Sequence, residues 1–244
     1  MSRTITGTAT TGILLTAPTD SPVTIVSGAL IESMPNNFAL IGGSLEGQPD
    51  YNFPWTITNS GFVEGKGANS TGVVLYGGGR IVNADSGYIS GGRQGIYTYY
   101  QPATVVNFGT VSAYGTSGTG IFLSKGGEVF NNGTVFGDVG GVKIINGANA
   151  TVINYGTIKN RANAPFGVSL GGFSSNYVKN AGYIEDSVVE TGSAGTLVNP
   201  GTIKGSISIG RGGIITNGAS GSTAARIDGF STFITGGVGT IANF

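Results

Sequence analysis

The stretch VVNFGTV at residues 105–111 decides the fold. Its order is apolar, any residue, Asn, any residue, Gly, any residue, apolar. The same order returns in ITNSGFV (57–63), VFNNGTV (129–135), VINYGTI (152–158), VKNAGYI (178–184) and LVNPGTI (197–203). Looser copies are IVNADSGYI (81–89) and ITNGASG (215–221), and TIAN (240–243) begins another. A motif that recurs in this way is the sequence signature of a solenoid.

The asparagines of the motif set the period of the repeat. Eight steps lead from Asn59 to Asn243, so a coil has roughly 23 residues. Coils stacked about 4.8 Å apart place equivalent side chains above one another. The expected asparagine ladder consists of Asn59, Asn83, Asn107, Asn131, Asn154, Asn180, Asn199 and Asn217. Each Asn either favours a turn locally or bonds to the next amide along the ladder, and both interpretations are structural.

Apolar residues accompany each asparagine in two columns, and nearly all are β-branched, as buried strands prefer. The column two residues before the asparagines is Ile57, Ile81, Val105, Val129, Val152, Val178, Leu197 and Ile215. The other column is Val63, Ile89, Val111, Val135, Ile158, Ile184 and Ile203. Further strands follow at GVVL (72–75), GIYT (95–98), GIFL (120–123), GVKI (141–144), GVSL (167–170) and SISI (206–209).

These patterns predict an all-β, single-stranded right-handed parallel β-helix of about ten coils. A β-sandwich is the alternative, because it also has short strands with turn signals between them. Residues 1–244 form one domain in this prediction. The segment 29–56, which holds three prolines and the only Trp, is expected to be an irregular loop or a partial cover.

The composition excludes several function classes. Gly accounts for 46 of 244 residues and charged residues for 10%, and the net charge is zero. A neutral chain without a basic run gives no steering toward nucleic acid. With no His and no Cys, the commonest general base and the usual soft metal ligands are missing. We expect no catalytic residues, no cofactor and no metal, and we expect no membrane insertion because no apolar stretch is long enough.

Two features keep a polysaccharide-binding or polysaccharide-degrading protein as the alternative function. Paired carboxylates can hydrolyse glycosides at a suitable separation, and the candidates are Glu46 with Asp50, and Glu185 with Asp186 near Glu190. Tyr97, Tyr99 and Tyr100 follow one another in a strand-like segment, and alternation puts Tyr97 and Tyr99 on one face. Exposed, they would stack on sugars or form a protein interface; otherwise they pack beneath an inserted loop.

The repeats resemble those in passenger domains of bacterial autotransporter-type adhesins and haemagglutinin-like β-helix proteins. The stretches that carry the resemblance are TVVNFGTVSA, EVFNNGTVFG, TVINYGTIKN and TLVNPGTIKG, with GIFL and GVSL as second strands. The resemblance covers roughly residues 56–217 and implies an extracellular or cell-surface β-helix, often adhesive. The N-terminus lacks the layout of a signal peptide, so the export route stays open.

The leading functional expectation is a structural surface protein rather than an enzyme. No amphipathic capping helix is visible at either end, and TIANF at 240–244 stops within a motif that matches TVVNF at 104–108. Solenoid ends without caps expose strand edges that pair with other chains. A head-to-tail contact that does not close produces a filament. We therefore expect the chain to assemble with itself, and an adhesive role is a further expectation.

Overall fold

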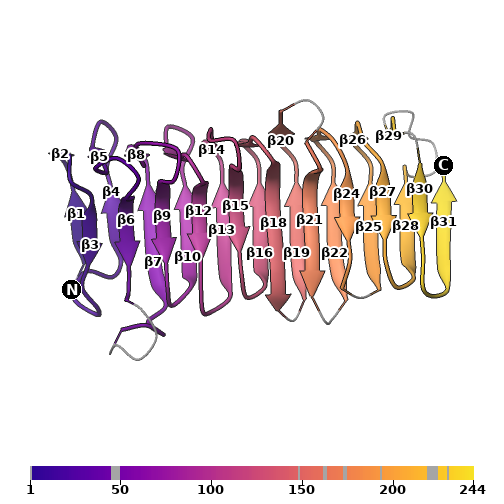
Figure 1. The fold of residues 1–244 in the computed structure, drawn as a ribbon, viewed down its shortest axis with the longest axis horizontal. Helices are drawn as coiled ribbons and strands as arrows, with labels where there is room; N and C mark the ends of the chain where they lie inside the picture. The colour runs from indigo at the N-terminus through magenta and orange to yellow at the C-terminus, as the bar shows by residue number, and fades with distance from the viewer. Residues whose placement is uncertain are drawn as a thin grey trace.

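The chain folds as an all-β parallel solenoid whose strands form a rod (Figure 1). A computed structural model describes residues 2–44, 50–147, 149–161, 164–172, 175–192, 194–218, 225–229 and 231–244. About nine turns of roughly 24 residues make up the stack, close to the expected ten coils of 23. Every strand pair in this described part is parallel and joins neighbouring coils, so the β-sandwich alternative is wrong.

The strands form three sheets, with eleven strands in sheet A and ten in each of sheets B and C, and a complete turn contributes one strand to each sheet. Sheet A consists of β1 (Arg3–Ile5), β4 (Val23–Ile25), β7 (Trp55–Asn59), β10 (Gly79–Asn83), β13 (Ala103–Asn107), β16 (Gly127–Asn131), β19 (Ala150–Asn154), β22 (Asn176–Asn180), β25 (Gly195–Asn199), β28 (Gly213–Asn217) and β31 (Gly239–Asn243). Sheet B consists of β2 (Thr8–Ala9), β5 (Leu30–Glu32), β8 (Phe62–Glu64), β11 (Tyr88–Gly91), β14 (Thr110–Ala113), β17 (Thr134–Gly137), β20 (Thr157–Asn160), β23 (Tyr183–Ile184), β26 (Thr202–Ile203) and β29 (Arg226–Ile227). Sheet C consists of β3 (Ile13–Leu15), β6 (Phe38–Gly42), β9 (Thr71–Leu75), β12 (Gln94–Thr98), β15 (Thr119–Leu123), β18 (Gly140–Gly147), β21 (Phe166–Gly172), β24 (Val188–Glu190), β27 (Ile207–Ile209) and β30 (Thr232–Ile234).

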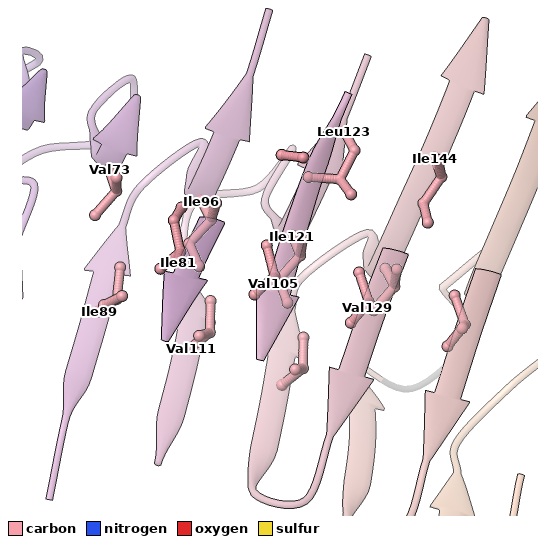
Figure 2. Packing of buried hydrophobic residues seen from close by; sticks show 14 of the residues in the cluster. Val73, Ile81, Ile89, Ile96, Val105, Val111, Ile121, Leu123, Val129 and Ile144 are labelled. Atoms are coloured by element: carbon pink, nitrogen blue, oxygen red, sulfur yellow. The ribbon is translucent and has the colours of Figure 1, made fainter. Parts of the chain in front are cut away.

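The register of the sheets confirms the predicted apolar columns. Val105 in β13 pairs with Ile81 on one side and Val129 on the other, and all three side chains are buried. In sheet B, Ile89 pairs with Val111 in the same way. Figure 2 shows these side chains meeting residues of sheet C in the middle of the rod. A continuous core forms because each strand repeats the inward position of its neighbour.

The expectation for segment 29–56 is wrong for much of its length. The segment supplies β5 and β6, which pair in register with β8 and β9 of the next coil. Trp55 opens β7 and is fully buried, with the ring of Phe53 4.9 Å away, centroid to centroid. Residues 45–49 lie outside the described residues. The sequence pattern did not predict these strands, because the Asn–Gly motif is missing from this part of the chain and the prolines suggested irregular structure.

One inward column of sheet C is apolar except at two coils, where it holds Thr98 and Glu190. The column reads Leu75, Thr98, Leu123, Ile144, Leu170, Glu190, Ile209 and Ile234. Glu190 is 0% exposed, and neither carboxylate oxygen has a hydrogen-bond partner among the described residues. Burial raises the pKa of Glu190 to about 7, because desolvation disfavours the charged form. The side chain is thus a buried acid, and the only ionisable group, in a row that is otherwise apolar apart from Thr98.

Candidate ligand-binding face

The predicted asparagines lie in one row inside the rod, at the end of the sheet A strands. The Nδ2 of Asn107 donates to Oδ1 of Asn131 at 2.8 Å, and Asn131 donates to Asn154 at the same distance. Equivalent bonds of 2.7 or 2.8 Å join all neighbours from Asn59 to Asn217, and Asn217 donates to Asn243. The eight predicted side chains are buried, so the row holds coils together and offers no surface to a ligand.

The amides of this row all point the same way. The Nδ2 of Asn107 also donates to the carbonyl oxygens of Gly109 and Thr134, at 3.2 and 3.1 Å. Both backbone partners are acceptors, so only the NH₂ group fits on that side of the amide. The same two kinds of carbonyl flank Asn131 and Asn154. The orientation of each amide is therefore fixed by the backbone of its own coil and of the next coil.

The three predicted tyrosines come together on the outer face of sheet C. Tyr97 lies in β12, and its ring centroid is 5.4 Å from that of Tyr99. The Tyr99 and Tyr100 centroids are 4.5 Å apart, and Tyr99 is 39% exposed. Thr98 between them is buried, so Tyr97 and Tyr99 lie outward as the alternation predicts.

Aromatic residues from other coils enlarge this cluster. Tyr76 follows β9 and lies 5.7 Å from Tyr99, and Phe122 in β15 lies 5.2 Å from Tyr97, centroid to centroid. Tyr51 packs edge-on against Tyr100, with centroids 5.9 Å apart and an interplanar angle of 79°. The tyrosines thus have one neighbour from the segment before β7, as the loop interpretation expected, while part of the cluster stays exposed.

The cluster borders a hollow of about 550 Å³. Its aromatic lining is Tyr51, Tyr97, Tyr99, Tyr100 and Phe122, and its polar lining includes Asn52, Gln101, Ser124 and Lys125. The Nε2 of Gln101 donates to Oδ1 of Asn52 at 2.8 Å, and the Ser124 hydroxyl donates to the carbonyl oxygen of Tyr99. The rim is therefore held in place by bonds between different coils.

A second hollow of about 270 Å³ adjoins the first one. Tyr97, Tyr99 and Phe122 line both hollows and form the wall between them. Phe38, Tyr76, Arg93 and Gln94 line the other sides. Burial raises the pKa values of Tyr76 and Tyr97 from the ordinary value of a tyrosine, so their phenols are neutral at physiological pH. We call the two hollows and their lining residues the tyrosine face.

The carboxylates considered for glycoside hydrolysis do not form one site among the described residues. Glu46 lies outside them, and Asp50 accepts a bond from the Ser44 hydroxyl. Asp186 has a positive φ of 65° and a raised pKa, first through burial and then through the charge of Glu185. Glu190 faces the core, so its carboxyl does not share a surface with Asp186.

Several residues of the tyrosine face did not stand out in the sequence. Phe122 occupies the same outward position as Tyr97 in the next strand of sheet C, and Val74 occupies it in the preceding strand. The signal was available in the third position of GVVL, GIYT and GIFL. Arg93 and Lys125 carry no such signal, because they lie just before β12 and just after β15, outside the repeated strand pattern.

Comparisons with known proteins return no match: no family model, no curated protein and no solved structure resembles this chain closely enough. Within the residues that the structure describes, no helix is long and apolar enough to span a membrane. No cluster of three or more acidic side chains suited to a metal ion occurs in those residues either. The function therefore has to be argued from the fold and from the tyrosine face.

Proposed function

We propose that the chain is a non-catalytic, extracellular structural rod of a bacterial surface that binds polysaccharide on its tyrosine face. The observation that carries the proposal is the cluster of Tyr97, Tyr99 and Tyr100 around a hollow of about 550 Å³. Aromatic rings offer large apolar area with little loss of conformational entropy, and a sugar ring has apolar C–H faces that pack on them. The likeness of the repeats to bacterial adhesin passenger domains supports the same assignment.

The fold makes this face rigid. β12 is paired along both edges, with β9 on one side and β15 on the other. The Tyr97 ring is packed against Phe122 and Tyr99, so a ligand would pay little to order it. Hydroxyls of a sugar would find the amides of Asn52 and Gln101 and the hydroxyl of Ser124 at the rim of the larger hollow. Apolar rings beside a few polar groups are the usual make-up of a small-ligand site.

The test is binding of the purified chain to a panel of soluble polysaccharides, by gel retardation and calorimetry. Tyr99→Ala removes the most exposed ring of the cluster. We expect it to weaken binding about tenfold or more, since full burial of such an apolar side chain is worth roughly 1.5–3 kcal/mol. Tyr155→Ala is the matched control, because Tyr155 is 54% exposed and lies outside the tyrosine face. Binding that Tyr99→Ala leaves unchanged, or no binding at all, would refute the proposal.

The same incubation separates a binding protein from a polysaccharide-degrading one. We propose a non-catalytic protein, so we expect neither new reducing ends nor unsaturated products after prolonged incubation with a bound polymer. The support is the position of the candidate carboxylates, since Glu190 points into the core and away from a polymer outside the rod. If the chain shortens the polymer, and if Glu185→Gln or Asp186→Asn abolishes this shortening, the enzymatic alternative is favoured.

Head-to-tail self-assembly stays a prediction. β1 and β31 are the outermost strands of sheet A, and Ile241 of β31 is 56% exposed although it continues the buried column of Ile215. If β31 of one copy paired with β1 of another, Asn243 would lie opposite Ile5. The reason is that Ile5 stands in the column of the asparagines, since it pairs with Ile25 and Ile25 pairs with Asn59. The amide row would not continue across such a joint. Electron microscopy of the purified chain tests the prediction, and compact monomers alone would contradict it.

A further inference from the structure

The two hollows of the tyrosine face hold positive charge at opposite ends of two neighbouring parallel strands. Arg93 lines the smaller hollow and immediately precedes β12, whereas Lys125 lines the larger hollow and follows β15 by two residues. Five-residue strands span roughly 16 Å, and the Tyr97–Phe122 wall lies between the two cations. A third cation, the ammonium of Lys143, lies 5.3 Å from the centroid of the Phe122 ring.

These cations have no ion-pair partner within the described residues. The salt bridges of that part of the chain use Arg3, Lys66, Arg161 and Arg226. Arg93 and Lys125 are exposed, and they are the charged residues among the described lining of the two hollows. The whole chain is neutral, with 12 basic and 12 acidic residues, so a face with only positive charge is a local feature.

The tyrosine hydroxyls do not oppose an anion on this face. Burial is the largest cause that raises the pKa values of Tyr76 and Tyr97. Neighbouring phenols raise them further: Tyr100 and Tyr99 act on Tyr76, and Tyr99 acts on Tyr97. At neutral pH the rings are therefore uncharged and their hydroxyls remain hydrogen-bond donors. Neutral rings flanked by Arg and Lys suit a polymer that combines sugar rings with acidic substituents.

We infer that the ligand of the tyrosine face is an acidic polysaccharide, lying along β12 and β15, whose anionic groups contact Arg93 and Lys125 while a sugar ring packs on Tyr97 and Tyr99. The inference rests on the proposed function and names its ligand class. Carboxylate and sulfate groups share the required chemistry, because both accept charge-assisted hydrogen bonds. A chain in this direction crosses the rod rather than following its axis, so each bound segment engages two or three coils.

The experiment compares matched polymers that differ in charge alone. Polygalacturonate and its methyl ester share one backbone, and dextran sulfate and dextran share another. We expect each acidic polymer to bind about tenfold or more tightly than its neutral counterpart, with an affinity that falls as salt is added. The two acidic polymers together show whether the face prefers carboxylate or sulfate.

Substitutions locate the effect. Arg93→Gln and Lys125→Gln each remove one cation, and we expect each to reduce binding of the acidic polymer about fivefold or more and to reduce its salt dependence. Lys204→Gln is the control, because Lys204 is exposed and lines neither hollow. Binding of the acidic polymer should not change in the Lys204→Gln variant.

The outcomes separate the inference from the proposed function. Neutral polymers that bind as tightly as acidic ones, in a manner that still depends on Tyr99, would overturn the inference and leave the proposed function standing. The same holds if Arg93→Gln and Lys125→Gln bind the acidic polymer as the unmodified chain does. Failure of every polymer to bind would overturn both.

Discussion

Oε2 of Glu190 occupies the space that a Cβ atom at position 195 would need, and that position is Gly195. Glu190 ends β24 and Gly195 begins β25, so the two residues face each other across the corner between sheets C and A. Asn176 lies in the preceding coil and pairs with Gly195. The Nδ2 of Asn176 is also buried without a partner among the described residues. The absence of a side chain at 195 is what lets an acid fit inside this coil.

The burial of Glu190 predicts a loss of stability as pH rises. The pKa of Glu190 is about 7 in the folded chain and 4.5 as the ordinary value. Between these values the folded chain keeps a proton that the unfolded chain has lost, so the free energy of unfolding falls as pH rises from 4.5 to 7 and then levels off. At about 1.4 kcal/mol per pKa unit the fall is roughly 3 kcal/mol. Urea unfolding across this pH range measures it.

Two variants isolate the contribution of Glu190. Glu190→Gln keeps the shape and cannot ionise, so we expect its advantage over the unmodified chain to appear only above about pH 5 and to grow toward pH 8. Glu185→Gln, with a half-buried side chain in the same coil, serves as the control. A stability difference between Glu190→Gln and the unmodified chain that is the same at pH 5 and pH 8 would show that this acid does not ionise within the core.

Removal of one amide from the row should destabilise the rod strongly. Asn131→Ala leaves Nδ2 of Asn107 without its 2.8 Å acceptor and Oδ1 of Asn154 without its donor. Oδ1 of Asn154 is then a buried group without a partner, which costs about 1–3 kcal/mol, while Nδ2 of Asn107 keeps only its longer bonds to Gly109 and Thr134. We therefore expect a loss of roughly 2–4 kcal/mol in the free energy of unfolding. Denaturant unfolding followed by circular dichroism measures the change.

The neighbouring residue gives a matched control for the amide row. Asn132 is exposed in the same turn, and Asn132→Ala should change the free energy of unfolding by no more than about 0.5 kcal/mol. Asn131→Asp is a sharper variant, because a carboxylate would face the carbonyl oxygens of Gly133 and Thr157. Equal stability of the Asn131→Asp chain and the unmodified chain at pH 7 would contradict the amide orientation described above.

The inward and outward positions of one strand should respond differently to truncation. Val105 is fully buried in the sheet A column, whereas its neighbour Val106 is half-buried on the outer face. Val105→Ala should cost about 2–3 kcal/mol through lost burial and the cavity that remains, and Val106→Ala less than about 1 kcal/mol. Parallel unfolding curves of the two variants test this, and equal losses would mean that the strand does not have one face in the core.

The only tryptophan reports on the coil that the sequence motif does not mark. Trp55 is fully buried at the start of β7, so we expect a blue-shifted emission and quenching by acrylamide several-fold weaker than in urea. Steady-state fluorescence of the folded and unfolded chain checks this. Quenching as efficient in the folded chain as in urea would instead fit the irregular loop that the prolines of this segment suggest.

Where the motif is present, the register of the rod could be predicted residue by residue. Asn107 and Gly109 fix a turn, and Val105 and Val111 lie at constant offsets from it, so alignment of the motifs is alignment of the coils. The outward direction of the Tyr97 and Tyr99 side chains could be predicted because side chains alternate between the two faces of a strand. These inferences succeeded because in a solenoid each position repeats the environment of the position one coil earlier.

The first two coils and the corner near Glu190 could not be predicted in this way. Ile5 and Ile25 stand where later coils have asparagine, so a search for the motif passes over β1 to β6. Glu190 is an ionisable residue in a largely apolar column, and the packing with Gly195 explains how it is accommodated. The tyrosine face joins residues from separate coils and turns, such as Tyr51 and Tyr100, whose proximity no periodic pattern contains.

The buried amides share one orientation, so the rod is directional: each Nδ2 donates toward the C-terminal end of the row and each Oδ1 accepts from the N-terminal side. Coils as different in length as the 18 residues between Asn199 and Asn217 and the 26 between Asn154 and Asn180 form the same amide bond. A duplicated coil inserted in the same sense would find both of its neighbours already complementary and would lengthen the rod by about 4.8 Å. Growth and shortening by whole coils are thus built into the architecture, whereas a coil inserted in reverse would set donor against donor.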